Sequence, residues 1–189
     1  MAAQRMITDL LADLPPTSDT IPPQSVAGWK QLQAWLADTV VSLKNGHGQI
    51  YLPRANPHTI DVTDANEWYA EQSPDWVLTL PSHYFSLDNG ALKYTGSVPV
   101  IVQVAGSVSI TCASNSQNIA VALGINGTPA VASEAFFKIG TGSDAASTAL
   151  HLITEVSTND TIGLFVKNET SPADITIETA NIQATTSAV

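Results

Sequence analysis

The sequence predicts an all-β domain, an antiparallel sandwich or barrel, that follows a short helical N-terminal extension. From about residue 90 to residue 184, runs rich in Val, Ile, Thr and Ala alternate with Gly, Asn, Asp, Ser and Pro, a pattern typical of short strands joined by turns. Over the first 48 residues, apolar side chains recur instead at steps of three and four, the period of an amphipathic helix. We therefore expect an extension over 1–48 and a β domain over 49–189.

The extension is predicted to hold two short helices joined by a polar, Pro-rich linker. The first helix stops at Pro15-Pro16, and its apolar residues are Met6, Ile7, Leu10, Leu11 and Leu14. The second is expected from about Ser25 to Lys44, with Asn45-Gly46 as its stop. Its apolar stripe consists of Trp29, Leu32, Leu36, Val40 and Leu43.

Two interpretations of the second stripe stay open at this point. It packs either on the β domain of its own chain, or on copies of itself or a larger assembly. The first helix is attached only through the Pro-rich linker, so it cannot bury its apolar face locally. It is therefore the better candidate for an anchor that holds the chain to a larger assembly.

Strand-like segments follow the extension in order. Ile60, Val62 and the run from Trp68 to Ala70 are expected to begin the sheet, and a further strand from Trp76 to Leu80 is closed by Pro81. Seven later runs, each bounded by turn residues, complete the β domain: Ala91 to Thr95, Val98 to Cys112, Asn118 to Asn126, Ala130 to Ile139, Ala149 to Val156, Thr161 to Asn168 and Asp174 to Gln183.

Two details of these runs carry structural predictions. Asn126-Gly127 accepts the positive φ angles of a type I′ turn, so a tight hairpin is expected there. In the run from Thr161 to Asn168, alternate residues are apolar, but Phe165 lies on the opposite, otherwise polar face. A strand with apolar groups on both faces is covered on both sides. Phe165 and the stripe of the second helix are therefore the candidate oligomer contacts.

The charge excludes two classes of partner. Seven basic against seventeen acidic residues give a net charge of -10, so the chain lacks the basic surface that binds nucleic acid. An anionic membrane surface would repel it for the same reason. Charged residues make up 13% of the chain, below the roughly 25% of an ordinary soluble domain. This composition fits β faces that are covered by a neighbouring sheet or subunit.

The sequence gives no sign of secretion, disulfide bonding or membrane insertion. The first residues lack a long apolar core and contain Asp9 and Asp13, unlike a secretory signal, so we expect the chain to be made in a cytoplasm. Cys112 is the single cysteine and is expected to be a small buried residue. No segment approaches the ~20 apolar residues of a membrane-spanning helix.

Residues that could carry chemistry are scattered. The four histidines are far apart in sequence: His47, His58, His83 and His151. His58 with Asp61 and Asp64 is the nearest approach to a metal-ligand cluster, but such a triplet in a surface turn is usually solvated. His151 is expected to be structural, although a pH-dependent interface is conceivable. No nucleotide-binding loop or nucleophile motif is present. We therefore expect no enzyme activity, no metal and no cofactor.

Three turn segments occur in a characteristic order along the strand runs. They are Tyr94-Thr95-Gly96, Asn126-Gly127 and Asn159-Asp160-Thr161. In this order, over about half of the chain, the sequence resembles the TNF/C1q-like jelly-roll domains of tailed-phage structural proteins. The resemblance implies an antiparallel jelly-roll sandwich. The sequence departs from the C1q pattern at residues 169–173, where those domains usually have one more strand.

The resemblance also implies a function. The chain would form a homotrimer, with one sheet of each protomer facing a threefold axis, and would stand on a virion surface as a capsid decoration or head-fibre protein. Its N-terminal region would hold it to the major capsid protein or another virion protein. The alternative is a receptor- or glycan-binding module of a phage tail fibre or tail tip. In that case the loops Ser114 to Asn118 or Gly140 to Ala146 would contact a host-surface glycan, although neither contains an aromatic residue.

Overall fold

A computed structural model describes residues 46–141 and 144–186 of the chain. The predicted helices lie outside these residues, as do the anchor candidates Met6, Ile7, Leu10, Leu11 and Leu14 and the stripe Trp29, Leu32, Leu36, Val40 and Leu43. These assignments remain predictions. The described residues form the β domain, whose first strand begins at His47, two residues before the predicted boundary.

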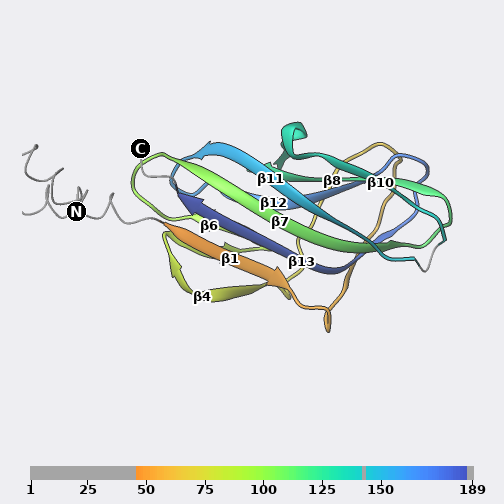
Figure 1. The fold of residues 1–189 in the computed structure, drawn as a ribbon, viewed down its shortest axis with the longest axis horizontal. Helices are drawn as coiled ribbons and strands as arrows, with labels where there is room; N and C mark the ends of the chain where they lie inside the picture. The colour runs from red at the N-terminus through yellow and green to blue at the C-terminus, as the bar shows by residue number, and fades with distance from the viewer. Residues whose placement is uncertain (1–45, 142–143, 187–189) are drawn as a thin grey trace, which may run out of the picture. The chain divides into compact units, whose positions relative to one another are not determined.

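Two antiparallel sheets make up the β domain (Figure 1). Sheet A has the order β11 (Ala146–Val156), β7 (Val100–Cys112), β13 (Ile175–Thr186), β1 (His47–Leu52) and β4 (Val77–His83), and β2 (His58–Ile60) also pairs with β13. Sheet B has the order β10 (Ala135–Ile139), β8 (Gln117–Ile125), β12 (Thr161–Asn168), β6 (Ala91–Tyr94) and β5 (Phe85–Asp88), with β3 (Tyr69–Ala70) on β12 and β9 (Thr128–Pro129) on β8. The predicted all-β, antiparallel sandwich is confirmed.

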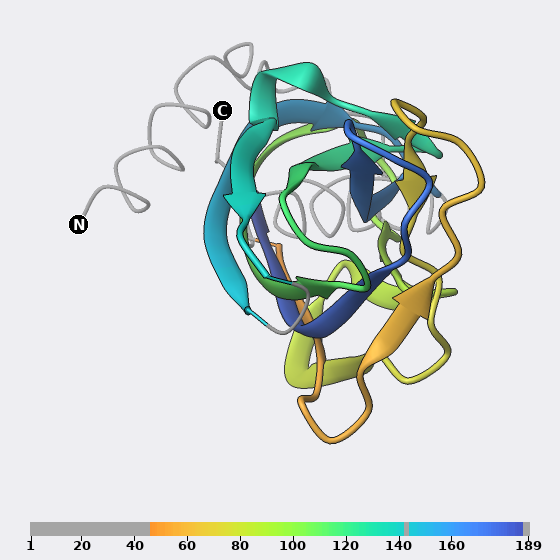
Figure 2. The same cartoon turned by 90° about the vertical axis from the view of Figure 1, so that its right-hand side faces the viewer.

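The chain crosses repeatedly between the two sheets, which is the jelly-roll connection. Strands β6, β7 and β8 belong alternately to sheets B, A and B, and β11, β12 and β13 to sheets A, B and A. Strand β12 leads directly to β13, so the segment 169–173 holds no strand. Figure 2, which looks along the sandwich, shows the strands wrapped around a common interior.

The core lies between the sheets because alternate residues of each strand point inward. Val104, Ile110 and Ile182 come from sheet A, and Leu123 and Leu164 from sheet B, all with at most 2% of their surface exposed. The predicted hairpin at Asn126-Gly127 is also confirmed. Both residues have positive φ angles, 50° and 79°, and the flanking strands β8 and β9 pair in register.

Three strand predictions need correction. The sheet begins at β1, ahead of the predicted start at Ile60. Strand β4 continues through Pro81 to His83, which an edge strand permits because its outer N–H groups need no partner. The predicted strand from Ala130 to Ile139 is interrupted by a 3₁₀ turn, η1 (Val131–Ser133).

Phe165 is apolar and outward-facing, as predicted, but the chain itself covers it. The ring is 4% exposed and lies over Gly124, beside the carbonyl of Thr128 in β9. A partner subunit is therefore not required to explain the apolar character of both faces of β12.

Candidate functional site

The outer faces of the two sheets differ in charge, and the difference identifies the candidate site. Strands β5, β6, β10 and β12 of sheet B contain Asp88, Lys93, Lys138 and Lys167. Strands β1, β2, β4, β7, β11 and β13 of sheet A contain no Lys or Arg, and their acidic residues are Glu155 and Glu178. We call the outward-facing side of β11, β7, β13, β1 and β4 face A.

Ion pairs and loops of the same chain occupy the outer face of sheet B. The Lys167 ammonium lies 2.8 Å from a Glu169 carboxylate oxygen and 3.5 Å from one of Glu134, and 4.7 Å above the ring of Trp68. The hydrogen bond to Glu169 is the main cause that raises the pKa of Lys167 above 10.5. Ser133 of η1 accepts a hydrogen bond from the Leu123 N–H of β8, at 2.9 Å. The charge of Lys167 is therefore compensated within the chain, and η1 continues the sheet edge beside β8.

Face A, in contrast, is built from short neutral side chains arranged in rows across the strands. One row, set by the strand register, runs Ala149, Ser107, Asn181, Tyr51 and Val77. The next runs His151, Ala105, Gln183, Gln49 and Thr79. The two carboxylates of face A lie toward its ends. Glu155 is next to the last residue of β11, and Glu178 accepts a hydrogen bond from Thr111 at the other end of the sheet.

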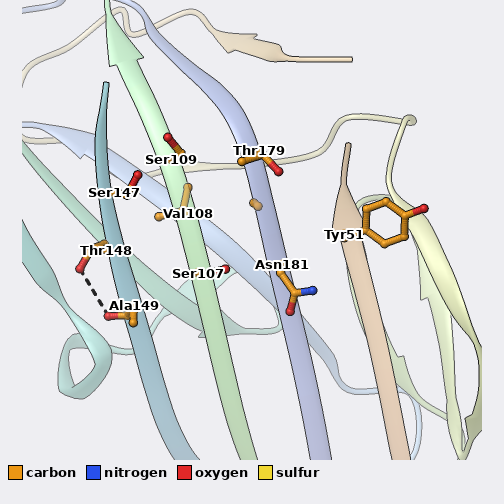
Figure 3. Close-up of a pocket in the computed structure, with 10 residues that line it drawn as sticks. Tyr51, Ser107, Val108, Ser109, Ser147, Thr148, Ala149, Thr179 and Asn181 are labelled. Carbon is orange, nitrogen blue, oxygen red and sulfur yellow. Dashed lines mark hydrogen bonds between the residues drawn. The ribbon is translucent and has the colours of Figure 1, made fainter. Parts of the chain in front are cut away.

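A shallow hollow of about 600 Å³ lies in the middle of face A (Figure 3). Hydroxyl, amide and small apolar groups from β11, β7, β13 and β1 line it: Tyr51, Ser107, Val108, Ser109, Ser147, Thr148, Ala149, Thr179, Ala180 and Asn181. No charged side chain lies among them. The hollow therefore suits an uncharged surface and offers no strong acid, base or nucleophile.

Large apolar side chains are exposed on face A and at its edge. Ile101 and Ile153 are 41% and 58% exposed on β7 and β11, and Tyr51 and Val77 are about as exposed at the opposite side. Phe136 of β10 and Val131 of η1 are exposed where sheet B adjoins β11. A face that carries exposed large apolar groups and has its few charges at the periphery is typical of a protein-protein interface.

Three of the four histidines lie on face A. His47 and His83 are cross-strand neighbours with ring centroids 6.4 Å apart, and His151 is opposite Ala105. The fourth, His58, is bonded to Glu71 at 2.7 Å and does not join Asp61 and Asp64 in a cluster. Within residues 46–141 and 144–186, no three His, Cys, Asp or Glu side chains come together as metal ligands.

The three turn segments that carried the resemblance meet at one end of the sandwich. Tyr94 exchanges backbone hydrogen bonds of 2.8 Å with Asn159 and Asp160. The Asn126 amide donates to the Asp160 carboxylate at 2.7 Å, and its oxygen accepts from the Thr161 N–H at 2.9 Å. The same end holds the start of β1 and the end of β13, because His47 pairs with Thr185. These segments are structural: they tie β6, β8 and β12 together.

The two loops proposed for glycan contact lie at the other end. The Ser116 N–H donates to the Gly140 carbonyl at 2.9 Å, so the loops Ser114 to Asn118 and Gly140 to Ala146 lie side by side, as far as the latter is described. Strands β1 and β13 have their opposite ends here. The loops therefore lie at the end of the sandwich away from His47.

Sequence reasoning missed a buried carboxylate near the edge of the domain. Glu71 is 2% exposed and accepts hydrogen bonds from the Ser73 N–H at 2.9 Å and the Trp76 indole N–H at 3.3 Å, in addition to its bond with His58. These bonds hold the segment between β2 and β4. No sequence pattern marks this acid, because its three partners depend on the path of the loop.

Comparison with a solved structure supports the fold of the chain and says nothing of its function. No family model matches the chain, and a search of curated proteins finds no match. Among solved structures, Eiger TNF from S. frugiperda is 9% identical with a TM-score of 0.54, covering 76% of this chain and 93% of that one. The PRD1 vertex protein P5 and murine APRIL are each 10% identical with TM-scores of 0.46, over 75% of this chain and 96% and 99% of theirs. The chain thus has the TNF-like jelly-roll fold.

Proposed function

We propose that the protein is a non-enzymatic structural protein of a virion that forms a homotrimer through face A. The observation that carries the trimer is the contrast between the two sheets. Around β12, the outer face of sheet B carries ion pairs within the chain, whereas face A has no Lys or Arg and its two carboxylates lie toward its ends. Its exposed apolar residues would be covered by a second copy.

A closed ring of three copies uses two different surfaces, because a threefold interface is heterologous. Face A would therefore contact another part of the neighbouring protomer. The exposed side chains Val131 and Phe136, at the edge where β10 and η1 adjoin β11, are suited to this role. Each copy would then place its β10–β11 edge against the face A of the next.

The position on a virion is supported by the three turn segments, whose order along the sequence resembles that in phage structural proteins. We propose that residues 1–48 attach the trimer to the major capsid protein or another virion protein, with Met6, Ile7, Leu10, Leu11 and Leu14 as the anchor. The second-helix stripe would contact its copies. The extension joins β1 at the end of the sandwich that holds His47, and the two paired loops lie at the opposite end.

A receptor- or glycan-binding module is the second candidate. The pairing of the loops at Ser116 and Gly140 favours it, since it forms one continuous tip. These loops contain no aromatic residue that a sugar could stack on. Binding of the chain to host cells or to a glycan array would move this function ahead.

Truncation tests the anchor and the trimer separately. A chain that starts at Lys44 keeps β1 intact. We expect this chain to be trimeric by native mass spectrometry and to be missing from purified particles that carry the full chain. A truncated chain that still joins particles would move the anchor into the β domain, and a monomeric full chain would refute the trimer.

A further inference from the structure

The end of the sandwich that holds His47 presents exposed apolar side chains on two segments. Val98, in the loop that leads into β7, is 45% exposed, and Leu80 of β4 is 76% exposed. The register between β4 and β1 places Leu80 in a bulge beside the start of β1. Both side chains therefore lie at the end of the domain where residues 1–45 are joined to it.

Hydrogen bonds within the chain fix the loop that carries Val98. The Tyr94 hydroxyl donates to the Val98 carbonyl at 2.9 Å. The Thr95 N–H donates to the Tyr84 carbonyl at 2.9 Å, which ties the loop to the residues that follow β4. Because this backbone is already held in place, a partner that covers the exposed side chains loses little free energy in ordering them.

The same end of the sandwich carries little charge. Its connecting segments contain a single charged residue, Asp160, and they are 80–82, 95–99, 126–127 and 157–160. Asp160 accepts hydrogen bonds from the Asn126 amide and the Ser157 N–H, both at 2.7 Å. The centre of a protein-protein interface is depleted in charged residues, so this end has the composition of a contact surface.

The opposite end of the sandwich is acidic. The Val62 N–H donates to the Asp174 carboxylate at 3.1 Å, and the Ala113 N–H to the Asp174 carbonyl at 3.0 Å, so the segment after β2 meets the loop after β7 there. The turns at this end contain one basic residue, Arg54, and the acidic residues Asp61, Asp64, Glu67, Asp144, Glu169 and Asp174. The charge of the β domain is therefore polarised along the sandwich, and an apolar partner surface fits the His47 end.

We infer that the His47 end, through Leu80 and Val98, docks on an apolar, weakly charged surface of the virion protein that holds the extension. This rests on the proposed attachment to a virion. The proposed anchor belongs to the chain that joins the domain at this end, so a particle that holds the anchor is brought close to these side chains. Once the anchor is bound, docking of the β domain is intramolecular, and the two contacts together hold the chain more tightly than either alone.

Co-sedimentation of the full chain with particles assembled without it tests the inference, with circular dichroism to confirm folding. The test variant L80D/V98D adds a charge at each of the two exposed positions. The control A55D/A113D adds the same charge at exposed positions toward the acidic end. If L80D/V98D does not fold, L80S/V98S takes its place, since it removes the apolar groups without adding charge.

The natural chain and the control should half-saturate the particles at the same protein concentration. The test variant should need at least about tenfold more protein, because an unpaired charge buried in the contact opposes docking. The serine variant should shift the concentration in the same direction by a smaller factor. All of these chains should be trimers by native mass spectrometry.

Equal binding by the natural chain and the test variant would overturn the inference and leave the proposed attachment intact. An equal loss of binding by the control would also overturn it, because added charge alone would then be the cause. A test variant that is a folded monomer would assign Leu80 and Val98 to contacts between copies, and the inference would be wrong. A natural chain that does not bind the particles would refute the proposed attachment and the inference with it.

Discussion

Replacement of Glu71 by alanine should destabilise the β domain strongly, although the residue lies far from the centre of the core. Its carboxylate accepts hydrogen bonds from Ser73 and Trp76, which are 1% and 3% exposed, so water cannot replace the lost acceptor. An enclosed donor left without a partner costs about 1–3 kcal/mol. Two such donors would cost about 2–6 kcal/mol of stability, and part of this cost is offset because the substitution also removes a buried carboxylate. We expect a loss of about 3 kcal/mol.

Urea denaturation at one fixed protein concentration measures this loss. With a slope of roughly 2 kcal/mol per molar urea, Glu71→Ala should lower the midpoint by about 1.5 M. Glu71→Gln keeps one oxygen for Ser73 and Trp76, so its cost should be about 1 kcal/mol. Glu67→Ala, at an exposed position of the same segment, should change the midpoint by less than about 0.3 M. Equal midpoints for the two alanine variants would refute the reasoning.

Two further substitutions test local packing. Gly124→Ala would place a methyl group against the ring of Phe165 and should lower the free energy of unfolding by about 1–3 kcal/mol. Gly163 pairs with Gly124 in the strand register, and a methyl group there would be 3.8 Å from its nearest neighbour, so Gly163→Ala should cost under about 1 kcal/mol. Similar melting temperatures for the two variants would contradict this packing. Burial, with a smaller effect of Tyr84, raises the pKa of the Tyr94 hydroxyl above 10.0 in the folded chain. Because the unfolded chain loses this proton more readily, the stability that the neutral Tyr94 contributes is lost as the pH rises beyond 10. Tyr94→Phe should cost about 1 kcal/mol at neutral pH and flatten this alkaline decline, and an unchanged decline would count against Tyr94 as its source.

The strands that sequence predicted best are those whose alternation is local. Strands β7 and β12 bury every second residue over most of their length, and their turns contain Asn, Asp or Gly. Strand β1 is short and pairs with β13, far along the chain, so its place in the sheet is decided by a non-local contact. The break at Val131–Ser133 likewise depends on the bond between Ser133 and Leu123.

The candidate site was harder to predict than the fold. Low charge indicated that some β surface is covered, but the sequence does not show which residues share a face. The register places His47, His83 and His151 on one side of sheet A, although they are far apart in sequence. For Phe165 the sequence indicated a partner subunit over the ring. The ring instead packs within the chain over Gly124, whose lack of a side chain leaves room for it.

Residues 46–141 and 144–186 contain no helix long and apolar enough to cross a bilayer.

The central claim is that copies of the chain associate through face A. Ser107 lies in the middle of this face, on the wall of the hollow, and Ser86 of β5 faces outward from sheet B. Ser107→Arg would bring an unpaired charge from each copy into the interface, which typically costs several kcal/mol per ion. Native mass spectrometry of the full chain should show trimers for the natural protein and for Ser86→Arg, and folded monomers for Ser107→Arg. A Ser107→Arg chain that remains trimeric, or a natural chain that is monomeric, would contradict the account.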